Sequence, residues 1–122
     1  MKKIIITGHS LGAALATLAS LDLQYDYDVV SYTFASPRVC DGFPTEGMRG
    51  FFRIDNTCDI IQQLPLAVML NFNNPKSPYY YQHSGDSMFF TDNKKGMGAN
   101  HLIDVFIGAV YKHELKQGIP VR

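Results

Sequence analysis

The order of apolar and polar positions along the chain predicts a β-α-β unit. Residues 2–7 are apolar on both faces and rich in isoleucine, which is typical of a strand inside a parallel sheet covered by helices. Residues 11–23 have a helical periodicity, and residues 29–36 and 51–56 are predicted as two further strands. A strand, a helix and a strand within such a short stretch predict parallel strands joined by a right-handed crossover.

The predicted helix over 11–23 has two distinct sides. Its leucines and an alanine are expected to be buried against the sheet, and its polar residues to form an exposed stripe: Leu11, Ala14, Leu15, Leu18 and Leu21 against Thr17, Ser20 and Gln24. Farther along, the composition of 71–78 predicts a loop, and residues 79–82 and 88–91 are predicted to pair as a β-hairpin. A last helix is expected from His101 to about Leu115, before Gly118 and Pro120.

Composition narrows the possible functions. The chain has 122 residues, enough for one domain, and its 46% hydrophobic and 18% charged residues are typical of a globular protein. Eleven Lys+Arg balance eleven Asp+Glu, so no basic surface is expected to bind nucleic acid or an anionic membrane. No apolar run is long enough for a transmembrane helix.

Two other classes of function find no support in the sequence. Cys40 and Cys58 are too few for a disulfide scaffold, and the cysteines and histidines lack the spacing of a metal site, so no metal or cofactor is predicted. The N-terminal Lys2, Lys3 and the apolar residues after them are similar to the start of a secretory signal, but residues 7–10 interrupt the apolar run. The absence of a convincing signal favours a cytoplasmic location.

The segment Gly8-His9-Ser10-Leu11-Gly12 is a G-x-S-x-G pattern between the first strand and the helix. In this context the serine lies in a strained turn, and glycine on either side removes Cβ atoms expected to collide there. The positive end of the helix dipole favours the negative charge that develops when the serine attacks a carbonyl. Ser10 is therefore a candidate nucleophile; the alternative is a glycine-rich turn with an idle serine.

A nucleophilic serine needs a general base, and the chain has four histidines. His9 adjoins Ser10 and is expected to point away from its hydroxyl in a structural role, and His113 is expected at the surface late in the last helix. His83 in the predicted hairpin connection and His101 at the start of the last helix remain. The position of His101 just before the last helix favours His101 as the general base, with His83 as the alternative.

The third member of such a triad is a carboxylate that orients the base. Asp59 follows the strand at 51–56, at the carboxyl end where catalytic groups gather in parallel sheets. Asp55 lies within that strand, and Asp41 and Asp86 are expected in turns. Asp59 is thus the candidate acid, with an ordinary loop carboxylate as the alternative.

These motifs together resemble the class 3, or fungal-type, lipase family. The matching segments, in the family's order and spacing, are residues 6–16, 32–39, 53–65, 83–85 and 101–102. The resemblance covers most of the chain and corresponds to the C-terminal half of the family domain. It implies a partial α/β-hydrolase fold with a mostly parallel sheet, flanking helices and a hairpin. It also implies hydrolysis of lipid acyl esters without a cofactor, with Ser10 as nucleophile, Asp59 as acid, His101 as base and the backbone N–H of Leu11 in the oxyanion hole.

The chain also departs from the family pattern. Cys40 stands where the family usually has Gly, Ile61-Gln62 where it commonly has Val-Pro, and no Trp follows residues 83–85. The strands, lid and second oxyanion donor that precede the nucleophile in the family are not in this sequence, so we expect a single, N-terminally incomplete lipase-like domain over residues 1–122.

Two consequences are expected from the incomplete N-terminus. Without a neighbouring strand, Lys3–Thr7 becomes an exposed apolar edge that is available for self-association. The chain alone is expected to be poorly active, and a catalytically impaired remnant or interaction module is the alternative to an enzyme. A phospholipase or feruloyl-type esterase on the same scaffold is the second alternative. The expected partners are a lipid or small ester substrate and, transiently, a lipid surface.

Overall fold

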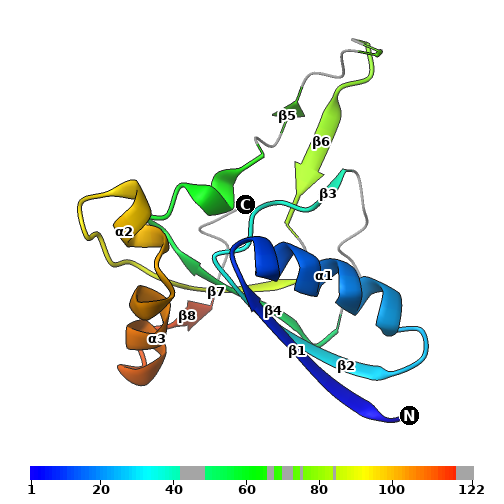
Figure 1. Ribbon diagram of the computed structural model, residues 1–122, viewed down its shortest axis with the longest axis horizontal. Helices are drawn as coiled ribbons and strands as arrows, with labels where there is room; N and C mark the ends of the chain where they lie inside the picture. The colour runs from blue at the N-terminus through cyan, green and yellow to red at the C-terminus, as the bar shows by residue number, and fades with distance from the viewer. Residues whose placement is uncertain (42–48, 66–67, 70–72, 75, 84, 118–122) are drawn as a thin grey trace.

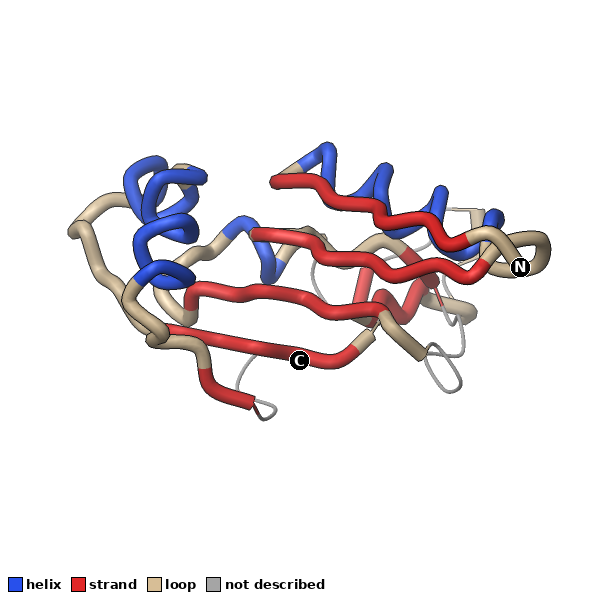
Figure 2. Tube along the Cα trace, turned by 90° about the horizontal axis from the view of Figure 1, so that it is seen from below, coloured by secondary structure: helices blue, strands red, loops and turns tan. Residues whose placement is uncertain are grey.

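The central feature of the fold is a mostly parallel sheet, whose strands lie one below another in Figure 2. The computed structural model describes residues 1–41, 49–65, 68–69, 73–74, 76–83 and 85–117. Within these residues the sheet has five strands in the order β1-β2-β4-β7-β8, namely Lys3–His9, Asp28–Phe34, Phe51–Asn56, Asp86–Phe90 and Lys116–Gln117. The first four strands are parallel and β8 is antiparallel to β7. The predicted α/β class with a mostly parallel sheet is confirmed.

Within the described part of the chain, three α-helices accompany the sheet (Figure 1). Helix α1 (Leu11–Leu23) connects β1 to β2 and packs on both of these strands. Helices α2 (Met97–His101) and α3 (Ile103–Tyr111) follow β7 and lie together at the left of Figure 2, at the end of the molecule away from the N-terminus. A short 3-10 helix, η1 (Ile61–Gln63), follows β4.

Among the residues that the structure describes, the core has two apolar clusters on opposite faces of the sheet. One gathers around α3 and the other around the end of α1: Ala35, Ile54, Phe90, Val105, Phe106 and Ala109 in the first, Leu21, Val29 and Phe51 in the second. Ile54 and Phe51 are both in β4 and an odd number of residues apart, so their side chains point to opposite faces. The strands are therefore apolar on both faces because each face has its own helix to pack against.

The predicted hairpin between 79–82 and 88–91 is wrong. β6 (Tyr79–Gln82) lies in a separate small sheet between β3 (Cys40–Asp41) and β5 (Val68–Met69), and it is antiparallel to both. β7 instead pairs in parallel with β4. This pairing buries Phe90 at 2% exposure against α3, a gain that an isolated hairpin does not offer.

The predicted buried side of α1 is correct for Leu21 but wrong for Leu11, Leu15 and Leu18. Leu11, Leu15 and Leu18 are 72%, 60% and 49% exposed, whereas the residues that face the sheet are Ala13, Ala16, Thr17, Ser20 and Leu21. Small side chains permit a close approach of helix and sheet. The Thr17 and Ser20 hydroxyls are satisfied because they donate to the carbonyls of Ala13 and Ala16, four residues earlier.

The last helix predicted from His101 to about Leu115 corresponds to α3, Ile103–Tyr111, whereas His101 ends the separate helix α2. Leu102 has the extended backbone angles φ −62° and ψ 139° and separates α2 from α3. The helix also ends early, at Tyr111, because residues 116–117 pair with β7 as β8. Gly118, Pro120 and part of the predicted 71–78 loop lie outside the described residues.

Candidate active site

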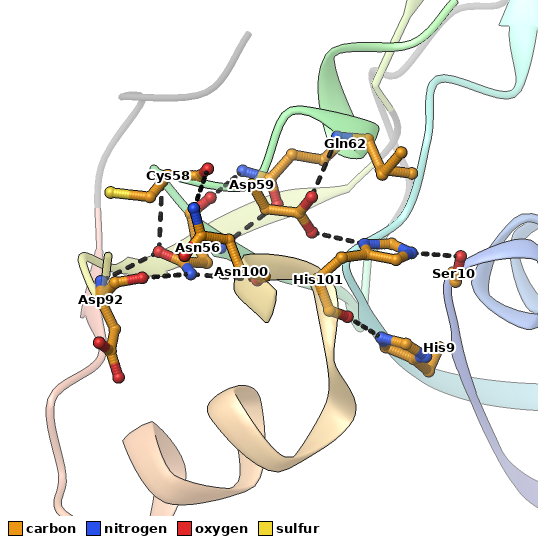
Figure 3. Close-up of polar contacts among 10 residues, drawn as sticks. His9, Ser10, Asn56, Cys58, Asp59, Gln62, Asp92, Asn100 and His101 are labelled. Carbon is orange, nitrogen blue, oxygen red and sulfur yellow. Dashed lines mark hydrogen bonds and ion pairs between the residues drawn. The ribbon is translucent and has the colours of Figure 1, made fainter. Parts of the chain in front are cut away.

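Three polar side chains meet beyond the carboxyl ends of the parallel strands (Figure 3). Ser10 follows β1 and Asp59 follows β4, and these strands end at the same edge of the sheet because both run parallel to β2. His101 is the last residue of α2, which lies beside this edge. The parallel topology thus gathers residues that are 42 and 91 positions apart in the chain.

Ser10 occupies a strained turn between β1 and α1. Its φ of 57° and ψ of −123° are unusual for a residue with a side chain. Its N–H donates to the Phe34 carbonyl at 2.9 Å, and its carbonyl accepts from the N–H groups of Ala13 and Ala14 at 2.9 and 3.1 Å. These backbone bonds hold the turn against its strain and leave the Ser10 hydroxyl directed at His101.

The two glycines of the motif differ in their steric role. A Cβ at Gly8 would lie 2.2 Å from the Gly12 carbonyl oxygen, so the crossing of β1 and α1 requires glycine there. A Cβ at Gly12 would meet nothing within 4 Å outside its own helix backbone and chain neighbours, among the residues that the structure describes. The prediction that both glycines avoid a collision is therefore correct for Gly8 and wrong for Gly12.

A line of hydrogen bonds joins the three side chains. His101 Nε2 lies 2.5 Å from Ser10 Oγ, and His101 Nδ1 lies 2.7 Å from Asp59 Oδ2. A carboxylate only accepts hydrogen bonds, so Nδ1 carries the imidazole proton and the lone pair of Nε2 faces the Ser10 hydroxyl. Asp59 is 1% exposed, and its other oxygen accepts from the Ile61 N–H at 3.0 Å.

His9 points away from the Ser10 hydroxyl, in line with the predicted structural role. Its Nε2 donates to the carbonyl oxygen of His101 at 2.7 Å, and its ring lies 5.0 Å from the His101 ring. His9 thereby contacts the backbone of His101, the residue whose side chain faces the Ser10 hydroxyl.

Leu11, the residue predicted to donate its backbone N–H, is the first residue of α1. The first N–H groups of a helix have no partner within the helix and lie at the positive end of its dipole. The Leu11 side chain is 72% exposed, so the helix start is open to an approaching molecule.

Three amide side chains around the site escaped the sequence reasoning. Asn56, Gln62 and Asn100 are 0%, 0% and 6% exposed and surround the loop that carries Asp59. The Gln62 amide bonds both backbone groups of Asn56, its Nε2 donating to the Asn56 carbonyl at 2.5 Å and its Oε1 accepting from the Asn56 N–H at 3.2 Å. One local signal existed, because Asn at the end of a strand two residues before Cys58 is typical of an Asx-turn.

His83, the other candidate base, lies in a different environment. It is 9% exposed, and burial together with the positive charges of Arg53 and Arg38 lowers the pKa of His83 to about 3. Nearby, burial raises the pKa of Asp55, although Arg53 and Ser87 donate to its carboxylate at 3.3 and 3.1 Å and oppose that rise. His83 and Asp55 therefore belong to a buried polar cluster and not to the line from Ser10 to Asp59.

Metal clusters and membrane-spanning helices are both absent from the described residues. They contain no group of three or more His, Cys, Asp and Glu side chains placed to hold a metal ion. None of their helices has the length and apolar character needed to cross a bilayer.

Comparison with known proteins identifies the family. The family profile described as Lipase (class 3) matches residues 1–69, more than half of the chain. The chain belongs to the class 3 lipase family. Phospholipase A1-II 7 of Oryza sativa subsp. indica is 32% identical over 62% of this chain, and secreted mono- and diacylglycerol lipase 1 of Fusarium solani is 33% identical over 68% of it.

Solved class 3 lipase structures agree with this assignment. The Rhizomucor miehei lipase propeptide complex superposes with a TM-score of 0.56 and 33% identity over 76% of this chain. The chain spans only 25%, 26% and 30% of the rice phospholipase, the Fusarium lipase and the Rhizomucor structure, respectively. The predicted α/β-hydrolase resemblance is thus confirmed for the part of the family domain that this chain contains.

Proposed function

We propose that this chain carries the reaction centre of a serine ester hydrolase that acts on lipid acyl esters. The observation that carries the proposal is the continuous line of hydrogen bonds from the Ser10 hydroxyl through the His101 imidazole to the Asp59 carboxylate. The orientation of each group supports a nucleophile, a base and an acid in these roles.

The reaction proceeds in two halves. Ser10 Oγ attacks the ester carbonyl while its proton passes to His101 Nε2, and Asp59 stabilises the imidazolium that forms. The tetrahedral intermediate collapses, the C–O bond to the alcohol breaks, and His101 returns the proton to the departing alcohol. Water then attacks the Ser10 acyl ester with His101 as base, which releases the fatty acid and restores the serine.

The backbone N–H of Leu11 donates to the oxyanion of each tetrahedral intermediate. Its position at the start of α1 and directly after Ser10 supports this role. One such donor contributes roughly 10²–10³ to kcat in related chemistry.

Exposed apolar residues beside the site support a lipid substrate and transient contact with a lipid surface. Each residue of the proposed triad is followed by an exposed apolar neighbour: Leu11 is 72%, Ile60 47% and Leu102 57% exposed. Water-facing leucine and isoleucine are unfavourable in a monomer but are suited to contact with acyl chains. The relatives named as lipases and phospholipases leave the head group open between acylglycerols and phospholipids.

A panel of esters tests the proposed activity and its substrate class. We expect weak hydrolysis of medium- and long-chain acyl esters, and loss of that activity in the Ser10→Ala variant. Parallel assays with diacylglycerol and phosphatidylcholine vesicles distinguish the two head-group classes. Hydrolysis limited to short, water-soluble esters would contradict the lipid assignment, and turnover unchanged in Ser10→Ala would contradict the enzyme itself.

The proposal also includes self-association of the chain through β1. Among the described strands, β1 forms one edge of the five-stranded sheet, and Ile5 on it is 67% exposed. An apolar groove of about 480 Å³ adjoins the end of β1 and is lined by Thr7, Gly8, His9, Phe34, Ile103, Ile107, Val110 and Tyr111. Pairing with the β1 edge of a second copy satisfies the backbone groups of that edge and covers Ile5.

A further inference from the structure

Two buried asparagines connect the loop that carries Asp59 to the helix that carries His101. Asn100 directly precedes His101, and Asn56 ends β4 three residues before Asp59. The hydrogen bonds drawn from these two side chains in Figure 3 go to backbone groups, including those beside Asp59 and His101, and not to the side chains of Ser10, Asp59 or His101.

The contacts fall on the peptide groups that immediately precede the proposed acid and base. The Asn100 amide Nδ2 donates to the Cys58 carbonyl at 3.0 Å, which belongs to the peptide bond leading into Asp59. The Asn56 Nδ2 donates to the Asn100 carbonyl at 3.2 Å, which belongs to the peptide bond leading into His101. Each asparagine therefore holds the backbone next to one member of the Asp59–His101 pair.

The chemistry of these positions suits a carboxamide and no other side-chain group. Besides the Asn100 carbonyl, Asn56 donates to the Asp92 carbonyl at 2.9 Å, and its Oδ1 accepts from the N–H groups of Asp92 and Cys58 at 3.0 and 3.2 Å. Asn56 thus uses both donors and both acceptor positions. The Asn100 Oδ1 accepts from the Lys94 N–H at 2.7 Å. A carboxylate lacks the donors, and a leucine of similar size lacks both functions.

We propose that Asn56 and Asn100 are positioning residues that set the 2.7 Å contact between Asp59 and His101. The inference rests on the proposed function for its catalytic meaning, but the geometric claim stands on these backbone contacts alone. Buried amides with all their partners hold a single arrangement, because every alternative leaves a buried polar group unsatisfied.

The direct test is the nuclear magnetic resonance signal of the His101 Nδ1 proton in protein with ¹⁵N-labelled histidine. In the wild type we expect a strongly downfield proton, assigned by its loss in His101→Gln. Asn100→Leu and the gentler Asn100→Asp are expected to shift this signal upfield or broaden it. Asn73→Leu, at an exposed position between β5 and β6, is the matched control and should leave it unchanged. An unchanged signal in both folded Asn100 variants would overturn the proposal.

A kinetic cycle tests the catalytic consequence. Asn100→Asp should lower kcat for a soluble ester by about tenfold to a hundredfold with little change in KM, since small displacements of reacting groups have effects of this size. In a His101→Ala background the same substitution should have no further effect, because the group that Asn100 positions is gone. Equal reductions in both backgrounds would show a general loss of folded protein and would overturn the positioning role.

The two readouts separate failure of this inference from failure of the proposed function. If the wild-type chain hydrolyses no ester but the His101 signal responds to Asn100→Asp, the positioning role holds and the hydrolase proposal fails. If esters are hydrolysed and neither readout responds to Asn100→Asp, the hydrolase proposal holds and the positioning role fails.

Discussion

The histidines of this chain differ because of the groups that surround them, and not because of their spacing. His101 lies between a hydroxyl and a carboxylate, and His9 donates to a backbone carbonyl. His83 is buried next to two arginines, so its protonated form is strongly disfavoured. A candidate base is therefore recognised by its partners, and these partners come from distant parts of the chain.

The lowered pKa of His83 predicts a loss of stability in acid. Because the pKa of His83 in the folded protein is about 3, against about 6.5 in an unfolded chain, the unfolded state binds an extra proton between these values. The free energy of unfolding should therefore fall by about 1.4 kcal/mol per pH unit as the pH drops below 6.5. Urea titrations from pH 7 to 4 should show that the free energy of unfolding depends less steeply on pH in His83→Gln than in the wild type. The exposed His113→Gln should have the same pH dependence as the wild type. Identical slopes in wild type and His83→Gln would contradict the burial argument.

The two motif glycines offer a matched pair of substitutions. Gly8→Ala should destabilise the fold by at least about 1–3 kcal/mol because its Cβ would overlap the Gly12 carbonyl. Gly12→Ala should be neutral or stabilising by up to about 1 kcal/mol, because alanine favours the helix and the site is open. Thermal unfolding of the two variants measures this difference, and equal destabilisation would show that the turn geometry is wrong.

The sequence could predict which three side chains the structure brings together but not what holds them. Ser10 and Asp59 are candidates because they follow parallel strands, and His101 is a candidate because it lies at the start of the predicted last helix. Asn56, Gln62 and Asn100 were missed because their partners are backbone groups up to 44 residues away. Such contacts leave no periodicity or spacing in the sequence.

At the scale of elements, helix α1 shows how a strong pattern can mislead. Its leucines form the apolar stripe that predicts a buried face, yet apart from Leu21 the face on the sheet carries small and hydroxyl-bearing residues. At the start of α1 the helix backbone lies so close to Gly8 of β1 that only small side chains fit between helix and strand, whereas Leu21 near the helix end is buried in the core. The existence and bounds of strands β2 and β4 were predicted well, because runs of β-branched and aromatic residues favour a strand whichever face of the sheet their side chains pack against.

Because Ala16 and not Leu15 faces the sheet, substitutions at these two neighbouring positions of α1 should have different effects on the free energy of unfolding. Leu15→Lys should change the free energy of unfolding by no more than about 0.5 kcal/mol, since Leu15 is 60% exposed. Ala16→Leu should destabilise by about 1–3 kcal/mol, because Ala16 is 6% exposed against the sheet. Urea unfolding checks both, and a large loss in Leu15→Lys with none in Ala16→Leu would restore the orientation expected from the sequence.

At the scale of the whole molecule, the described surface is apolar in places where a monomer is usually polar. Ile5 on the edge strand, three leucines of α1 (Leu11, Leu15 and Leu18) and the groove beside α3 all face outward. The sequence could not predict that β6 and β7 belong to different sheets. A strand's partner depends on which sheet edge is open and which core is available, and local sequence does not contain this information.

Self-association through β1 is the prediction that belongs to this scale. Ile5→Lys places a charge on the edge strand and should shift the sedimentation velocity profile from dimer toward monomer. Tyr25→Lys is the control, because Tyr25 is 77% exposed but lies in the turn between α1 and β2. A wild-type protein that remains monomeric at high concentration would contradict the proposal, as would equal effects of the two variants.

The reactivity of Ser10 toward a fluorophosphonate probe tests the central claim most directly. The probe phosphonylates a serine oxygen, with loss of fluoride, only when a neighbouring base activates the hydroxyl, so peptide mapping by mass spectrometry should find the adduct on Ser10. The adduct should be absent in Ser10→Ala and formed at least about a hundredfold more slowly in His101→Ala. Folded wild-type protein that stays unlabelled, or that is labelled equally fast without the His101 imidazole, would contradict the account.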